Sequence, residues 1–192
     1  MLTVAAAVVV IHFVNAKVYG PGQQISSYFE ALQEGDGERA LGLLSAKVPQ
    51  SNAALLDGDA LRAAAADLEL IQIGEPRDAG DNRVDMDVTY TVGDEEARST
   101  FRLARVEKDW FFFDRWSFVP SVLPTVTVTA PSQREAVLNG VQVALPEETT
   151  TFASFYPARV ETSYESEFFA APSETGVLTS PRETLSLTLA TE

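Results

Sequence analysis

Segment 84–92 is the feature that most constrains the fold, because every second residue in it is apolar. It reads VDMDVTYTV, so aspartates and threonines alternate with the apolar positions. A period of two predicts a β-strand with one buried and one solvent-facing side. We expect Asp85 and Asp87 to be exposed. The side chains expected to face the core are those of Val84, Met86, Val88, Tyr90 and Val92.

Further strand-like segments flank this one. Residues 68–75 (LELIQIGE) precede it, and Gly93-Asp94 turns the chain into a strand that includes Phe101. Lys108-Asp109 then turns it into the aromatic segment 110–118. Consecutive strands joined by tight turns predict an antiparallel meander of four strands.

Three short helices are expected before the strands. Gly20-Pro21 is a suitable start for the first, since proline is tolerated at the first helical position. Gly35 ends it, and Asp36 is placed to cap a second helix. Residues 57–66 (DGDALRAAAA) predict a third, Ala-rich helix. The apolar face of the first helix comprises Ile25, Tyr28, Phe29 and Leu32.

Helices followed by a meander predict an α+β fold over residues 20–118, with three helices packed on a curved antiparallel four-stranded sheet. Pro120 and Pro124 bracket an expected linker at 119–125. Residues 126–192 are rich in Ser and Thr and show no helical period, which predicts a small all-β domain. Asn139-Gly140 predicts a tight hairpin there. The expected strands are Val126–Thr129, Val137–Asn139, Val141–Leu145, Thr150–Tyr156, Arg159–Tyr164 and Leu185–Leu189.

The stretch SSYFEALQEGDGERALGLL, a further helix and four strands ending in WFFFDRWSF resemble the nuclear-transport-factor-two-like family. The resemblance covers about residues 20–118 and implies a cone-shaped α+β domain. It is strongest to versions that lie outside single transmembrane helices in Gram-positive and actinobacterial envelope proteins. Those versions often begin with YF-x-AL-x-x-GD, matched here by Tyr28, Phe29, Ala31, Leu32, Gly35 and Asp36.

Residues 1–19 are expected to be a transmembrane or signal segment. Residues 2–14 (LTVAAAVVVIHFV) are apolar except for Thr3 and His12. This run is shorter than the roughly 20 residues of a spanning helix, and no Lys or Arg precedes it. We therefore favour a transmembrane helix that begins upstream, in a single-pass cell-membrane protein with everything after Lys17 outside. A cleaved signal peptide of a secreted protein and a buried core helix are the alternatives.

Composition excludes several kinds of chemistry. The net charge of −14 disfavours binding to nucleic acid, because phosphate would be repelled. The chain has no cysteine, and its only histidine, His12, lies in the apolar N-terminal run. The folded region therefore offers no thiolate and no imidazole for nucleophilic catalysis or metal binding. We expect no cofactor, no metal site and no enzymatic activity.

Some members of the resembling family are isomerases or dehydratases that work from a cavity lined by the sheet. The residues that would line such a cavity here are Tyr28, Met86, Tyr90, Trp110 and Asp114. Asp114 is the only acid expected among inward aromatic side chains. A carboxylate held there with a raised pKa would mark a site. The alternative is that Asp114 pairs with Arg102 or Arg105 and that the aromatic side chains form the core.

An acidic turn near residues 78–87 is a second candidate, because its carboxylates could attract calcium. Its spacing lacks the central glycine and closing glutamate of a helix–loop–helix site. A solvated hairpin is therefore the preferred interpretation.

Three functions remain open. The first is a non-catalytic extracytoplasmic module of a membrane-anchored envelope protein, which mediates protein contacts or sensing with envelope or membrane partners. The second is binding of a small apolar ligand, or isomerase-like activity, in the cone cavity. The third is a wall-binding domain in the Thr-rich half, which would need an exposed aromatic row at Phe152, Phe155 and Tyr156. A cone filled by its own side chains would favour the first.

Overall fold

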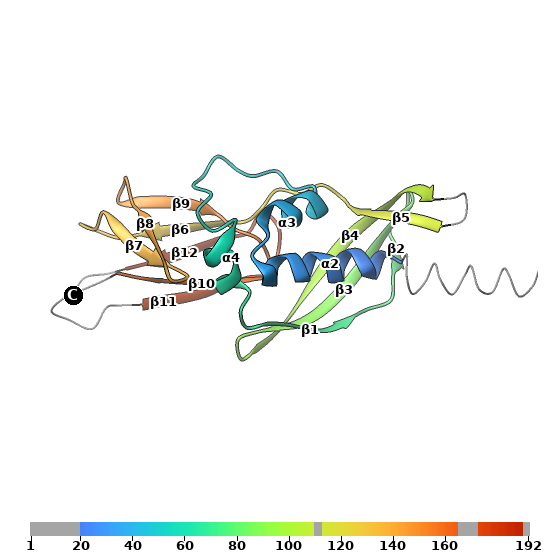
Figure 1. The fold of residues 1–192 in the computed structure, drawn as a ribbon, viewed down its shortest axis with the longest axis horizontal. Helices are drawn as coiled ribbons and strands as arrows, with labels where there is room; N and C mark the ends of the chain where they lie inside the picture. Colours follow the sequence, from blue (N-terminus) through green and yellow to red (C-terminus); the bar gives the residue numbers. More distant parts are fainter. Residues whose placement is uncertain (1–19, 110–112, 165–172, 190–192) are drawn as a thin grey trace, which may run out of the picture.

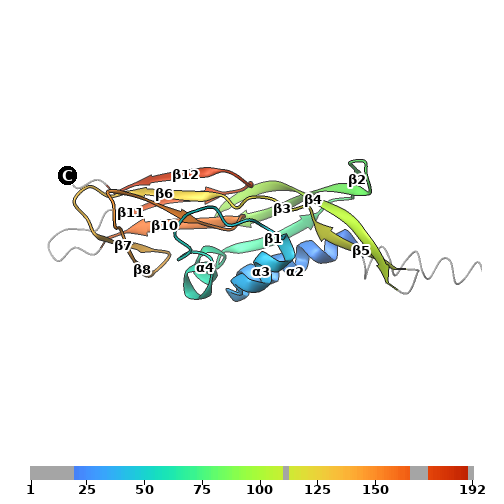
Figure 2. The same ribbon diagram turned by 90° about the horizontal axis from the view of Figure 1, so that it is seen from above.

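The computed structural model describes residues 20–109, 113–164 and 173–189. In this part of the chain, three helices lead into twelve strands, and the molecule is elongated (Figure 1). Figure 2 shows the helices together on one side of the strands. None of the described helices is long and apolar enough to cross a membrane.

The helices form where the capping residues predict them. Helix α2 (Pro21–Glu34) ends at Gly35, whose φ of 71° is in the left-handed region that glycine adopts freely. Helix α3 (Gly37–Leu44) follows, and the Asp36 carboxylate accepts a hydrogen bond from the Arg39 amide at 2.9 Å. Helix α4 is the segment Gly58–Ala64.

The first half of the chain builds a curled sheet with the order β1-β3-β4-β5, to which β2 adds by pairing with β3. All of these pairs are antiparallel. The strands are β1 (Leu68–Ile73), β2 (Arg77–Asp78), β3 (Arg83–Val92), β4 (Glu95–Asp109) and β5 (Phe113–Phe118).

The register of β3 follows the alternation in its sequence. The side chains of Met86, Val88, Tyr90 and Val92 are buried, as predicted, and Val84 is half-buried. Asp85 lies on the opposite face and is half-buried rather than exposed, because the Arg102 guanidinium covers it with two hydrogen bonds of 2.7 Å. Asp87 is likewise half-buried, since Arg77 and Thr100 bind its carboxylate.

The second half forms two more sheets, of orders β11-β10-β7-β8 and β12-β6-β9. Strand β6 is central in the smaller sheet and pairs in parallel with β12. The hairpin predicted at Asn139-Gly140 joins β7 to β8. The sequence did not indicate β11. The strands are β6 (Thr125–Thr129), β7 (Glu135–Leu138), β8 (Val141–Ala144), β9 (Thr149–Ala153), β10 (Ala158–Ser163), β11 (Ser173–Leu178) and β12 (Thr184–Thr188).

The predicted fold class, an α+β fold of three helices packed on a curved four-stranded sheet with a small all-β domain after it, is wrong. Strands account for nearly half of the described residues and helices for about a fifth. The curled sheet has five strands, and two of the helices are only 8 and 7 residues long. Helices of about two turns cover little of a sheet. Phe155 and Tyr156, from the second half of the chain, also pack against aromatic side chains of the first half.

Backbone hydrogen bonds join the two halves along segment 119–125. The Lys47 amide donates to the Ser121 carbonyl at 2.8 Å, and the Leu123 amide donates to the Lys47 carbonyl at 3.1 Å. Asn52 pairs with β9 in the same way, by bonds of 2.9 and 2.8 Å. The buried apolar side chains form one cluster that runs from Ile25 to Leu189. The two halves therefore share a core.

Candidate functional site

The side chains expected to line a cavity are packed into the core. Tyr28 and Tyr90 are fully buried and Met86 is nearly so. The Tyr28 hydroxyl donates to the Tyr156 carbonyl at 2.7 Å, and the Tyr90 hydroxyl lies 2.6 Å from the Ser99 hydroxyl. Burial raises the pKa of Tyr28 and of Tyr90, so both phenols stay neutral near pH 7. Trp110 lies outside the described residues.

Aromatic rings fill the concave side of the curled sheet. Tyr28 makes edge contacts with Phe101, Phe118 and Phe155, at ring-centroid distances of 6.0, 5.6 and 6.3 Å. Tyr156 stacks on Phe101 with the rings 5.6 Å apart and 9° from parallel. These are the preferred geometries of packed aromatic pairs. Because Phe155 and Tyr156 come from the second half of the chain, that half closes the space in which a cone cavity would lie.

By strand alternation, Asp114 lies on the same face of β5 as the buried Phe118. Its carboxylate lies 3.6 Å from the guanidinium of Arg105, one of the two partners considered for it. The side chain of Asp114 is 22% exposed. It therefore takes part in an ion pair near the surface rather than standing at the bottom of an apolar pocket.

The other sequence candidates are also structural. The expected aromatic row at Phe152, Phe155 and Tyr156 is buried. In the acidic turn, the Asp78 carboxylate accepts a hydrogen bond from the Gly80 amide. Among the described residues, no three His, Cys, Asp or Glu side chains are grouped so that they could hold a metal ion.

The structure offers instead a groove where α4 and the β3–β4 turn meet the outer face of the four-stranded sheet. It consists of two adjoining hollows of about 390 and 720 Å³, and Asp67 and Arg159 line both. We call it the junction groove. Its other lining residues are Ala63, Ala64, Val92, Gly93, Asp94, Glu95, Val137, Asn139, Gly140, Glu161, Ser163, Thr175, Gly176 and Val177.

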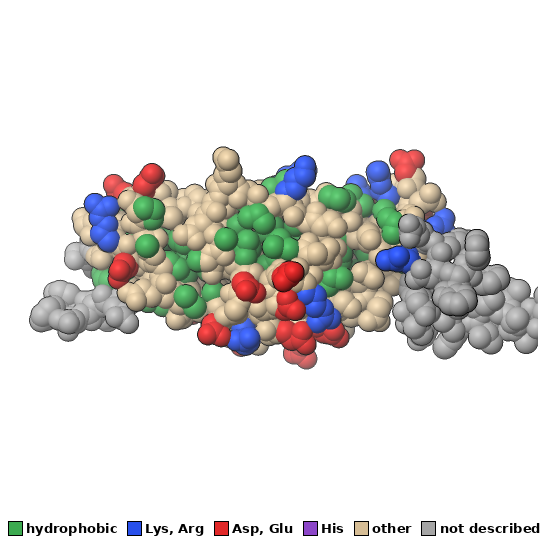
Figure 3. Space-filling view, turned by 45° about the horizontal axis from the view of Figure 1, so that its top comes forward, with side chains coloured by type: hydrophobic (Ala, Val, Ile, Leu, Met, Phe, Trp, Pro, Cys, Tyr) green, Lys and Arg blue, Asp and Glu red, His purple; other side chains and the backbone are tan. Residues whose placement is uncertain are grey.

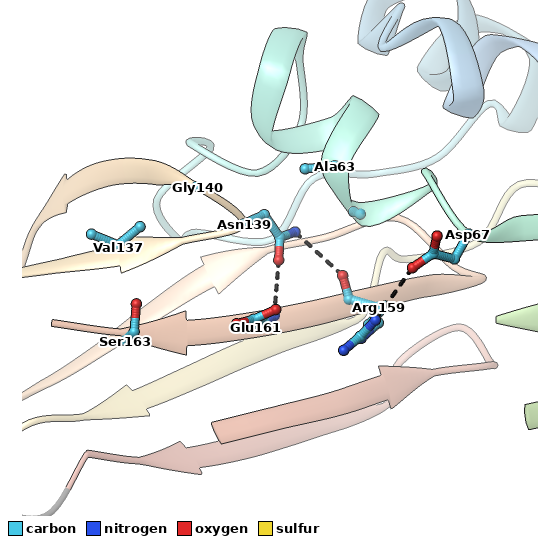
Figure 4. Close-up of a pocket in the computed structure, with 9 residues that line it drawn as sticks. Ala63, Asp67, Val137, Asn139, Gly140, Arg159, Glu161 and Ser163 are labelled. Carbon is cyan, nitrogen blue, oxygen red and sulfur yellow. Dashed lines mark hydrogen bonds and ion pairs between the residues drawn. The ribbon is translucent and has the colours of Figure 1, made fainter. Parts of the chain in front are cut away.

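An ion pair lies in the middle of the junction groove. The Arg159 guanidinium, on β10, is 3.3 Å from the carboxylate of Asp67, which follows α4 (Figure 4). Both side chains are more than a third exposed, so the pair adds at most about 1 kcal/mol to stability. Its position makes it a contact between the two halves, and both charges stay accessible to a partner.

Asn139 holds one end of the groove in place. Its φ of 48° fits the two-residue turn with Gly140, whose φ is 78°. The buried side-chain amide donates to the carbonyls of Ala60 on α4 and Arg159 on β10, both at 3.3 Å. Its oxygen accepts from the Glu161 amide at 2.8 Å. Asn139 therefore ties its own hairpin to α4 and β10, and Figure 4 shows its two bonds to β10.

The charge of the groove is negative. Asp67, Asp94, Glu95 and Glu161 line it and are exposed, whereas Arg159 is the only cation among its lining residues. On the face shown in Figure 3, by contrast, acidic and basic side chains lie beside one another. An open groove with unbalanced carboxylates attracts Lys and Arg side chains of a partner, because it is electrostatically complementary to them.

No protein-family model, curated protein or solved structure matches the chain.

Sequence reasoning missed the junction groove. Asn139-Gly140 was identified as a hairpin turn, but nothing local indicates that its amide reaches α4, 79 residues earlier. Arg159 and Asp67 are 92 residues apart. The sequence does contain one signal for this site: basic residues are rare after position 120, and Arg159 is one of only three. An isolated cation among many acids is a candidate for a specific contact.

Proposed function

We propose that this chain is a non-catalytic module of a membrane-anchored cell-envelope protein that makes contacts with other proteins on the outside of the membrane. The observation that carries the proposal is the filled concave face of the curled sheet. Seven aromatic side chains from both halves occupy the place that a substrate would need. They are Tyr28, Phe29, Tyr90, Phe101, Phe118, Phe155 and Tyr156.

The chemistry of the polar groups also supports a non-catalytic role. Acid–base catalysis needs a titrating group that is held near its reacting partner in a cleft. Tyr28 and Tyr90 are neutral phenols engaged in buried hydrogen bonds, and Asp114 pairs with Arg105. Neither the phenols nor this carboxylate is presented to a substrate in the concave face.

The junction groove is the surface that we assign to protein contacts. It is open, polar and acidic, as expected of the binding side of a transient interface more than of a small-molecule pocket. The stretch from Tyr28 to Asp36 resembles the start of extracytoplasmic domains in envelope proteins, which supports a location outside the membrane. The apolar run at residues 2–14 also supports this location.

The proposed location outside the membrane can be tested with a single introduced cysteine, because the natural chain has none. Ser180 is exposed and lies in the β11–β12 connection, so Ser180→Cys provides one accessible thiol. A membrane-impermeant maleimide should label this variant in intact bacterial cells. Labelling only after lysis would place the folded part inside the cell and overturn the proposed location.

The contact surface can be tested by photo-crosslinking in intact cells. A photoreactive residue at Thr175, in the groove, is compared with one at Thr188, which is also exposed but lies on the other sheet. We expect a discrete adduct from position 175 that weakens at least five-fold when Asp94 and Glu95 are both changed to Lys. Identical adducts from both positions, or no effect of the charge reversal, would contradict the assignment.

A further inference from the structure

Asn139 is followed by glycine, and this pairing gives it a chemistry that no other asparagine of the chain shares. The backbone nitrogen of Gly140 can attack the side-chain carbonyl of Asn139, because glycine has no Cβ to hinder the approach. This reaction, deamidation, needs neither an enzyme nor a cofactor. The other asparagines of the chain do not precede a glycine, and they are Asn15, Asn52 and Asn82.

The reaction changes an amide into an acid. The Gly140 nitrogen loses its proton to solvent and forms a bond to Cγ of Asn139, while the bond from Cγ to Nδ2 breaks and ammonia leaves. Water then opens the five-membered imide ring. Opening at the side-chain carbonyl gives aspartate, and opening at the backbone carbonyl gives isoaspartate, whose main chain is longer by one carbon. Either product carries a new negative charge.

The folded protein opposes this reaction. Closing the imide ring requires the Asn139 side chain to rotate toward its own backbone, but three hydrogen bonds direct it toward α4 and β10 instead (Figure 4). Two of these bonds come from Nδ2 and one goes to Oδ1, so both atoms of the amide group are held. Asn139 is also only 9% exposed, which limits the access of the water that opens the ring.

The elements that hold Asn139 are short and are attached by few bonds. We call the contact of α4, the β7–β8 hairpin and β10 the junction. Strand β7 pairs with β10 at only two positions, Leu138 and Val137, and α4 has 7 residues. Local opening of such elements costs less free energy than unfolding of the whole protein. We propose that Asn139 is a deamidation site that the closed junction protects and that local opening of the junction exposes.

Neither product can restore the closed junction. A carboxylate has no N–H, so the carbonyls of Ala60 and Arg159 lose the donor that Nδ2 supplies, and the new charge faces them instead. Isoaspartate also lengthens the two-residue turn between Leu138 and Val141, which disturbs the register of the hairpin. An opening that is followed by deamidation therefore becomes permanent.

The product also changes the junction groove, because Asn139 lines it. A carboxylate at this position joins four exposed acids, and Arg159 remains the only cation among the lining residues. The groove becomes more acidic while one of its walls is loosened. Deamidation itself depends on neither the location of the protein nor its partners, so it can be tested apart from the proposed function.

The first test compares rates of deamidation in the purified full chain at pH 8, folded and in guanidinium chloride. Peptide mapping by mass spectrometry quantifies the acid formed at each asparagine. In the unfolded chain, Asn139 should react at least ten-fold faster than Asn52 or Asn82. Folding should slow Asn139 at least ten-fold. A reaction as fast in the folded chain as in the unfolded one, or no preference for Asn139 in the unfolded chain, overturns the proposal.

Hydrogen exchange identifies the opening that is responsible. The Glu161 amide donates to Asn139 Oδ1, so its exchange with solvent reports release of the Asn139 side chain. The factor by which folding slows this exchange should agree within about three-fold with the factor by which it slows deamidation. If Asn139 is instead protected as strongly as the slowest-exchanging amides of the core, only global unfolding exposes it, and the proposal fails.

A matched pair of variants tests the same point by loosening the junction. Asp67→Ala removes the ion pair to Arg159, which joins the two halves beside Asn139, whereas Asp59→Ala removes an exposed ion pair within α4. In the folded chain, Asp67→Ala should speed deamidation and Glu161 exchange by the same factor, at least two-fold. Asp59→Ala should leave both rates unchanged. Faster exchange in Asp67→Ala without faster deamidation overturns the proposal.

Discussion

The hydroxyl of Tyr28 donates a hydrogen bond to the backbone carbonyl of Tyr156 at 2.7 Å, although the two residues are 128 positions apart. Tyr28 is on the first described helix and Tyr156 is in the connection between β9 and β10. Both residues also contribute rings to the aromatic cluster. One buried contact thus combines a polar bond and apolar packing at the place where the halves meet.

Removing this bond alone should measure how strongly it joins the halves. Tyr28→Phe keeps the ring and leaves the Tyr156 carbonyl without its partner, which should cost about 1–3 kcal/mol. Urea unfolding of the full chain gives the value. The control is Tyr164→Phe, at a half-buried tyrosine that directly follows β10. It should change stability by less than about 0.5 kcal/mol. Equal effects of the two changes would show that the bond contributes nothing specific.

The register of β3 predicts opposite outcomes for two neighbouring substitutions. Val88 is fully buried, so Val88→Asp should cost several kcal/mol by burying an unpaired charge. Thr89 lies on the other face, opposite Arg98 in the ladder. Thr89→Asp should therefore be tolerated, because a cross-strand opposite charge is favourable. Thermal melting separates the two, and a similar midpoint for both variants would contradict the register.

The Asp85–Arg102 pair predicts a pH dependence. Hydrogen bonding to Arg102 lowers the pKa of Asp85 below its ordinary value. A depressed carboxyl pKa contributes stability at pH values above the ordinary pKa, and this contribution is lost as pH falls through the folded-state value. Asp85→Asn should thus lower stability at pH 7 by about 0.5–1 kcal/mol, since the pair is partly exposed, and should lower it less at pH 2.5.

The control for this pair is Asp59→Asn. Asp59 forms an ion pair with Arg62, and the Asp59 side chain is 86% exposed. Its effect should be near zero at both pH values. A loss of stability in Asp85→Asn that is the same at pH 7 and pH 2.5 would show that the charge of Asp85 is not responsible.

Asn139 combines a left-handed backbone with a bonded side chain, and two substitutions separate these roles. Asn139→Gly keeps the backbone conformation and removes three side-chain hydrogen bonds, which should cost about 2–3 kcal/mol. Asn139→Ala should cost about 1 kcal/mol more, because alanine disfavours a φ of 48°. Hydrogen exchange at residues 58–64 should speed up in both variants, since α4 loses its tie to β10. Unchanged exchange there would contradict the role of Asn139 as a tie.

Two glycines of α3 should respond in opposite directions to the same change. A Cβ at Gly37 would lie 1.8 Å from the Leu56 carbonyl oxygen, so Gly37→Ala must displace the chain and destabilise the protein. Gly42 has no atom within 4 Å of such a Cβ, and Gly42→Ala should stabilise by about 0.5–1 kcal/mol. Paired melting curves test both. A stabilising Gly37→Ala would mean that α3 does not pack against residue 56 so closely.

The parts that could be predicted from the sequence are those that local chemistry determines. Alternation around Val88 placed the buried face of β3, Gly35 placed the end of α2, and Asn139-Gly140 placed a hairpin. Each depends on residues only a few positions apart. Such patterns show which side of an element is buried, but they do not identify what covers it.

That limit explains the error in fold class, and it explains why the sequence did not indicate the junction groove. The apolar face of the curled sheet was assigned to helices because helices adjoin it in sequence, whereas Phe155 and Tyr156 cover part of it from far along the chain. The junction groove depends on the same kind of pairing, between Asp67 and Arg159. Phe155 and Tyr156 become buried only when the two halves pack together, so local sequence patterns do not predict their burial.

The parallel pairing of β6 with β12 bears on how the protein is made. Thr125 and Thr184 face each other in this ladder, 59 residues apart, and β6 is the central strand of its sheet. During synthesis, β6 therefore emerges long before β12 and keeps an open edge until residues 184–188 have left the ribosome. Pairings of such long sequence separation form late and slowly. This sheet therefore cannot complete its hydrogen-bond ladder until residue 188 has been translated, so the order of synthesis delays its folding.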